Sequence, residues 1–118
     1  IWMDYEIGCD AAGHLTFCQV EFVGDTGAYA SVGMKVLERS AGHATGAYNF
    51  PVTDVVSTAV YTNNLPCGAM RGFGVTGVDF AIESHMDDLT SMYFKRKEYY
   101  DVARNAKKGK KDHSDRYV

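Results

Sequence analysis

The stretch from Asn63 to Gly77, which reads NNLPCGAMRGFGVTG, constrains this chain more than any other. Four of its fifteen residues are glycine, and they surround one arginine, Arg71, and one aromatic residue, Phe73. Glycine adopts positive φ without strain and lets the backbone approach a ligand closely. A helical pattern begins directly after the stretch, and a helix N-terminus attracts anions. The stretch is therefore an anion-binding loop or a tight turn with a surface arginine, and it fits neither the dinucleotide fingerprint nor the P-loop.

The pattern near the start of the chain predicts a hairpin. Residues 3–9 and 15–23 each alternate between apolar and polar side chains, which is the period of a half-buried strand. Residues 10–13, Asp-Ala-Ala-Gly, are typical of the turn between two such strands. Residues 24–27, Gly-Asp-Thr-Gly, predict a second turn that ends the second strand.

The three cysteines, Cys9, Cys18 and Cys67, are an odd number without a Cys-x-x-Cys pair. Such usage is typical of free thiols in a reducing compartment, so we expect a cytoplasmic protein. In the predicted hairpin Cys9 pairs near His14 or Leu15, too far from Cys18 for a disulfide. A zinc site built from Cys9, His14 and Cys18 lacks a fourth ligand, so no metal site is predicted. No apolar run approaches the ~20 residues of a membrane helix, and no membrane association is expected.

The remaining pattern completes an α+β fold. Small and apolar side chains at helical spacing predict a helix over residues 33–44, which carries Arg39. Residues 52–61 are rich in valine and threonine and predict a third strand. After the glycine-rich stretch, Thr76 with Asp79 resembles a capping box that opens a long amphipathic helix. We therefore expect a hairpin, a helix, a strand and a helix, with a small and mostly antiparallel sheet.

Charge is distributed unevenly along the chain. Residues 1–90 carry three basic and eleven acidic side chains, whereas residues 91–118 carry nine basic and four acidic ones. The basic run at residues 107–111 has no apolar period and is typical of a solvated tail. Aromatic residues precede it, so one hypothesis is a non-catalytic remnant or interaction module that acts through this tail; nucleic acid is the less favoured partner.

Four blocks of the chain resemble a known family. They are GDTGAYAS at Gly24–Ser31, LERSAGH at Leu37–His43, YTNNLPCGAMRGFG at Tyr61–Gly74 and FAIESHMDDL at Phe80–Leu89. Together they resemble the large, molybdenum-binding subunit of the xanthine dehydrogenase and aldehyde oxidase family, with the bacterial xanthine dehydrogenase-like hydroxylases the most similar branch. The resemblance covers residues 1 to about 90 and implies that residues 1–94 are part of a molybdopterin-binding domain. The change in composition from Lys95 predicts that residues 95–118 are a basic tail, partly helical or disordered.

The resemblance also implies site residues. Arg71 matches the arginine beside the molybdenum centre, and Gly72 follows it in the cofactor-binding loop. Arg39 matches an arginine that contacts the purine substrate, where a guanidinium stabilises developing negative charge. Phe73 matches a phenylalanine that packs against the substrate ring. These matches favour a small purine-type heterocycle as substrate.

The resemblance places other parts of the reaction outside this chain. The family's catalytic glutamate lies downstream of the matching blocks, so the catalytic residues are unknown from this sequence. Iron–sulfur clusters and FAD, which carry the electrons away, belong to other parts of such enzymes. The family commonly has a glutamine where this chain has Gly77. We therefore expect a fragment of a molybdopterin-dependent oxidoreductase that is not catalytic alone. The start of the sequence at Ile1 rather than methionine agrees with this expectation.

Overall fold

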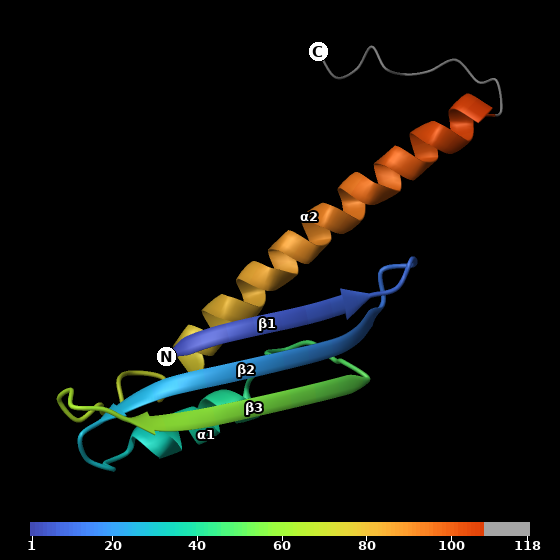
Figure 1. Cartoon of the computed structure of the whole chain (residues 1–118). Helices are drawn as coiled ribbons and strands as arrows, with labels where there is room; N and C mark the ends of the chain where they lie inside the picture. Colours follow the sequence, from blue (N-terminus) through green and yellow to red (C-terminus); the bar gives the residue numbers. More distant parts are fainter. Residues whose placement is uncertain (108–118) are drawn as a thin grey trace. The chain divides into compact units, whose positions relative to one another are not determined.

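The computed structural model describes residues 1–107. The chain forms five elements in sequence order (Figure 1): β1 (Trp2–Cys9), β2 (Leu15–Gly27), α1 (Gly33–Gly42), β3 (Val52–Tyr61) and α2 (Val75–Lys107). This order confirms the predicted α+β class of hairpin, helix, strand and helix. The third strand occupies the predicted residues 52–61.

The strands β1 and β2 form the predicted antiparallel hairpin (Figure 1). Cys9 pairs with Leu15 and Cys18 pairs with Ile7, so the predicted separation of the two cysteines along the hairpin is confirmed. Alternate side chains of the two strands are buried, as their period predicted: Tyr5, Cys18, Val20 and Phe22.

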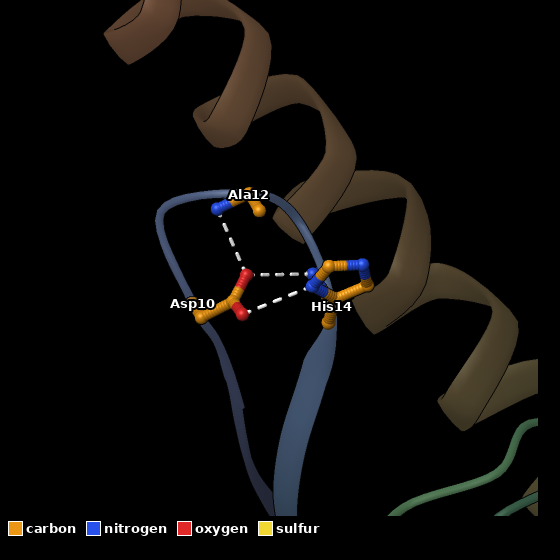
Figure 2. Close-up of polar contacts among 3 residues, drawn as sticks. All are labelled: Asp10, Ala12 and His14. Carbon is orange, nitrogen blue, oxygen red and sulfur yellow. Dashed lines mark hydrogen bonds and ion pairs between the residues drawn. The ribbon is translucent and has the colours of Figure 1, made fainter.

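Asp10 closes the hairpin turn (Figure 2). Its Oδ1 accepts hydrogen bonds from the backbone N–H groups of Ala12 at 2.8 Å and His14 at 2.9 Å. Its Oδ2 lies 3.0 Å from His14 Nδ1. The backbone N–H of His14, followed by the His14 ring, lowers the pKa of the Asp10 carboxyl below its ordinary value. In the part of the chain that the structure describes, no group of three or more His, Cys, Asp or Glu side chains is placed to hold a metal ion.

The strand β3 pairs with β2 in parallel, so the prediction of a mostly antiparallel sheet is wrong. The strand order is β1-β2-β3, with one antiparallel and one parallel pairing. The physical reason is the connection between β2 and β3. It passes through α1 and returns the chain to the end of the sheet where β2 begins, so that β3 runs in the same direction as β2. Parallel neighbours need such a crossover, whereas antiparallel ones need only a tight turn.

The predicted turn at residues 24–27 is also wrong, because β2 continues to Gly27. Gly24 and Asp25 stay paired with β3, and this ladder carries the strand past the expected break. Gly24 serves packing rather than turning, since a Cβ there would lie 2.6 Å from the side chain of Leu37 on α1. The strand ends at Gly27, which takes a φ of 76°.

The core lies between one face of the sheet, α1 and the first turns of α2. The Tyr5 hydroxyl donates a hydrogen bond of 3.1 Å to the carbonyl oxygen of Ala44, and its ring meets Phe22 edge to face at 5.9 Å. Burial, in the first place, raises the pKa of Tyr5. The buried apolar residues are Tyr5, Cys18, Val20, Phe22, Leu37, Ala44, Phe50, Val78 and Ile82.

The start of α2 differs from the predicted capping box. The helix begins at Val75, so Thr76 lies inside its first turn rather than before it. The Thr76 hydroxyl donates a hydrogen bond of 3.2 Å back to the carbonyl oxygen of Arg71. The predicted amphipathic character of the helix is confirmed where α2 meets the core, because Val78 and Ile82 are fully buried.

The chain divides into two units, Ile1–Met86 and Asp87–Val118. The family resemblance lies almost wholly in the first unit, and every site residue predicted from it falls there. The predicted basic run begins at Lys107, and its other residues lie outside the described residues. None of the described helices is both long and apolar enough to cross a membrane.

Candidate functional site

The predicted glycine-rich stretch follows β3 and ends in the first turn of α2, and we call residues 62–74, between the two elements, the glycine loop. Its middle is open to solvent: Leu65 and Met70 are 88% and 85% exposed. A Cβ on Gly68 would meet no atom within 4 Å. Both ends of the loop, in contrast, are held by hydrogen bonds to β2 and to α1. The loop is therefore a tethered segment with an accessible tip.

Asp25, near the end of β2, holds the start of the glycine loop. Its Oδ1 accepts hydrogen bonds from the Thr62 hydroxyl at 2.6 Å and from the Gly27 N–H at 2.7 Å. Its Oδ2 accepts a hydrogen bond of 2.6 Å from Asn64 Nδ2. The Thr62 side chain first, and then the Asn64 side chain, lower the pKa of the Asp25 carboxyl below its ordinary value of 3.8. The sequence pattern does not reveal these contacts, because the two side chains lie 37 and 39 residues away.

Backbone hydrogen bonds extend this anchor along the first part of the loop. They join the Thr62 N–H to the Gly27 oxygen at 3.1 Å and the Cys67 N–H to the Thr26 oxygen at 3.1 Å. Gly27 allows this approach, because a Cβ there would overlap the Leu65 carbonyl oxygen. The loop thus lies along the end of β2 as far as Cys67.

The end of the glycine loop is a tight turn with three consecutive positive φ values. They are 90° at Gly72, 54° at Phe73 and 95° at Gly74. The Phe73 N–H donates to the Met70 oxygen at 2.8 Å, and the Val75 N–H donates to the Gly72 oxygen at 3.2 Å. Phe73 is the one non-glycine with positive φ among the described residues, a conformation that costs ~1–2 kcal/mol. Backbone strain of this kind concentrates at functional sites.

The turn packs directly on α1. The Ser40 hydroxyl is fully buried and lies 2.9 Å from the Val36 oxygen and 3.3 Å from the Gly74 oxygen, so it bridges α1 and the loop. A Cβ on Gly74 would overlap Ser40 Oγ and lie 2.6 Å from the Val36 oxygen. No side chain larger than glycine fits between the turn and α1.

This contact joins the two segments that carry the predicted site residues. Arg39 directly precedes Ser40 on α1, and its side chain is exposed. Arg71 and Gly72 are exposed on the loop, and Phe73 is half-buried. The Ser40–Gly74 contact therefore joins the α1 segment that carries Arg39 to the turn that carries Arg71 and Phe73.

Two arginines give the region its positive charge. Arg39 and Arg71 are two of the three basic side chains in residues 1–90. The third, Lys35, forms an ion pair of 2.8 Å with Glu38, whose hydrogen bond raises the pKa of the lysine. No ion pair engages Arg39 or Arg71 within the described part of the chain. Their guanidinium groups are thus available to an anionic or oxygen-rich ligand.

Comparison with known proteins identifies the family to which the chain is similar. Residues 1–93 match the family model of the molybdopterin cofactor-binding domain. A probable xanthine dehydrogenase subunit of Bacillus subtilis (strain 168) is 44% identical over 85 residues, which cover 72% of this chain and 11% of that protein. The nicotinate dehydrogenase large molybdopterin subunit of Eubacterium barkeri is 44% identical over 87 residues, which cover 74% of this chain and 20% of that protein.

A solved structure agrees with these matches. The aldehyde oxidoreductase of Desulfovibrio gigas superposes with a TM-score of 0.73 at 27% sequence identity. The superposition covers 77% of this chain and 10% of that one. The chain thus spans between about a tenth and a fifth of the length of these relatives.

Proposed function

The chain belongs to the molybdopterin cofactor-binding domain family, and from that premise we propose that its residues 1–94 form one wall of the molybdopterin and substrate pocket of a xanthine dehydrogenase-like hydroxylase. One observation carries the proposal: the Ser40–Gly74 contact, which unites the α1 segment of Arg39 with the turn of Arg71 and Phe73. When bound, the molybdopterin supplies the oxidation–reduction chemistry. The residues of this chain bind and orient.

Arg71 and Gly72 are the proposed cofactor contacts. The Arg71 guanidinium is exposed and has no ion pair within the described residues, so it is free to meet an oxygen-rich group. Gly72 exposes its backbone where a Cβ would overlap Thr76 Oγ1, so the turn keeps this shape only with glycine. The partial positive charge at the start of α2, at Val75, adds to the attraction for an anionic group.

Arg39 and Phe73 are the proposed substrate contacts. A guanidinium at Arg39 stabilises negative charge on an oxygen or nitrogen of a purine-type ring while the ring is attacked. The half-buried Phe73 ring offers a flat apolar surface for such a heterocycle. Two of the relatives are named for xanthine and for nicotinate, which are both flat nitrogen heterocycles.

The rest of the enzyme is the proposed partner of this chain. The relatives are five to ten times longer than the segment that they share with it, to order of magnitude. We expect the general base, the iron–sulfur clusters and FAD to come from those other parts. The edge strand β3 offers them a surface, because Val52 and Val56 are 62% and 50% exposed there.

The test is the substrate selectivity of an Arg39→Leu variant in the complete enzyme. Removing one group that stabilises transition-state charge costs ~100-fold or more in rate, so kcat/KM for purines should fall by about that factor. Turnover of an aromatic aldehyde should change by less than about threefold, since an aldehyde places no such charge at Arg39. Lys35→Leu, which removes another exposed basic residue from the same helix, is the control and should leave the turnover of both substrates unchanged. Equal losses for purine and aldehyde would contradict the role of Arg39.

A further inference from the structure

We propose that Asp25 is a positioning residue that fixes the start of the glycine loop and thereby the placement of Arg71. This inference rests on the proposed function, because it assigns Asp25 a task within the same site. Three hydrogen bonds of 2.6 to 2.7 Å converge on its carboxylate, from the Thr62 hydroxyl, the Gly27 N–H and the Asn64 amide. All three donors belong to the junction between the end of β2 and the loop.

The strand explains why Asp25 reaches the loop. Successive side chains of β2 point to opposite faces of the sheet. Gly24 faces Leu37 of α1, and the buried Thr26 donates a hydrogen bond of 3.0 Å to the Val60 oxygen. Asp25 therefore points away from the core, to the side where the loop passes. The continuation of β2 beyond its expected end is what gives the carboxylate this position.

The charge of Asp25 matters as well as its shape. A carboxylate that accepts three hydrogen bonds is held more firmly than a neutral acceptor, because charge-assisted bonds are about twice as strong. The lowered pKa of Asp25 agrees with this, and the N-terminal amino group of Ile1 is the charged group that also lowers it.

Among the described residues, few contacts hold the loop between this anchor and the Arg71 turn. The last backbone bond of the anchor is at Cys67, and a Cβ on Gly68 would meet nothing within 4 Å. Met70 is 85% exposed. Release of the anchor should therefore increase the opening of the loop around Arg71.

The loop itself supplies the assay, because trypsin cleaves after arginine and Arg71 is exposed. Cleavage after Arg71 in the full chain is followed by mass spectrometry, with cleavage after Lys35 and Arg39 on α1 as internal references. Asp25→Ala and Asp25→Asn should each be cut after Arg71 about tenfold faster, since cleavage follows the population of the opened loop. Asp54→Ala, which removes an exposed acid from the same sheet, is the matched control and should leave the rate unchanged.

A swapped pair separates positioning from general stability. In Asp25→Asn the new Nδ2 faces the Nδ2 of Asn64, so the Asn64 amide must turn over to accept from it, and the charge-assisted bonds of the carboxylate are lost. The Asp25→Asn/Asn64→Asp double variant restores a donor and an acceptor with the net charge unchanged, and its Asn oxygen still accepts from Thr62 and Gly27. The double variant should therefore return cleavage after Arg71 to within about twofold of the unsubstituted chain.

Three results would overturn the inference. One is unchanged cleavage in Asp25→Ala. Another is a double variant that is cut as fast as Asp25→Asn. The third is equal acceleration at Arg71 and at the α1 sites in both single variants, which would make Asp25 a general stability residue. In the complete enzyme, Asp25→Ala should also lower the molybdenum content. Normal content with a loosened loop would contradict the proposed function and leave the positioning intact.

Discussion

Gly74 offers a test of the contact that joins the glycine loop to α1. Substitution by alanine forces a side chain onto a backbone with a φ of 95°, which costs ~1–3 kcal/mol. The added Cβ also overlaps Ser40 Oγ and lies 2.6 Å from the Val36 oxygen, and such crowding costs a further ~1–3 kcal/mol. Gly74→Ala should therefore lower the free energy of unfolding by about 2–6 kcal/mol.

The assay is urea unfolding followed by circular dichroism. With a denaturant slope of ~2 kcal/mol/M, the midpoint should fall by about 1–3 M. Gly68→Ala in the same loop is the control, because Gly68 has open space around it and its midpoint should stay the same or rise slightly. If the two variants unfold at the same urea concentration, the turn does not pack on α1 as described.

Three further predictions concern the buried core and the two groups whose pKa values are shifted, the Tyr5 hydroxyl and the Asp25 carboxyl. Ile82→Ala, at a fully buried position, should cost about 2–5 kcal/mol of unfolding free energy, and a cost below ~1 kcal/mol would mean that α2 does not cover the core. Because burial raises the pKa of Tyr5, the fold favours its protonated form. Its contribution is present below the ordinary value of 10.0 and is lost as pH rises above it, so unfolding at pH 7 and pH 11 should show a smaller gap between Tyr5→Phe and the unsubstituted chain at the higher pH. The lowered pKa of Asp25 has the opposite sign: its contribution is present above 3.8 and is lost as pH falls below, so the gap to Asp25→Asn should close in acid, and a gap that does not vary with pH would refute this.

Periodicity predicted the hairpin strands because they are half-buried, whereas β3, which is largely exposed, was predicted from its valine and threonine content. Tyr5 and Val20 alternate with exposed neighbours, and that alternation is visible in the sequence. The parallel pairing of β3 could not be predicted in this way, because it depends on where α1 returns the chain. The continuation of β2 through Gly24 was missed for a similar reason. Glycine next to aspartate usually indicates a turn. Here the glycine is required because the side chain of Leu37, which is distant in sequence, packs against it.

The backbone conformation of the glycine loop was predictable in part, whereas the contacts that hold the loop were not. The density of glycine around Arg71 indicated a loop with positive φ, which Gly72 and Gly74 confirm. Positive φ at Phe73 had no signal, because a bulky residue rarely takes that conformation. Arg39 was linked to the loop by family resemblance alone. Its neighbour Ser40 supplies the physical link, because the buried Ser40 hydroxyl donates a hydrogen bond to the backbone oxygen of Gly74. The spacing of residues in the sequence does not predict this contact.

The central claim, that the glycine loop borders the cofactor, is tested most directly by the molybdenum content of the complete enzyme. Arg71→Ala is compared with Lys35→Ala, which removes a basic residue of the same unit from outside the loop. Both variants should keep the unfolding temperature of the unsubstituted enzyme, because both side chains are exposed. The molybdenum bound per polypeptide should fall in Arg71→Ala and stay complete in Lys35→Ala. Full molybdenum content in Arg71→Ala would contradict the claim.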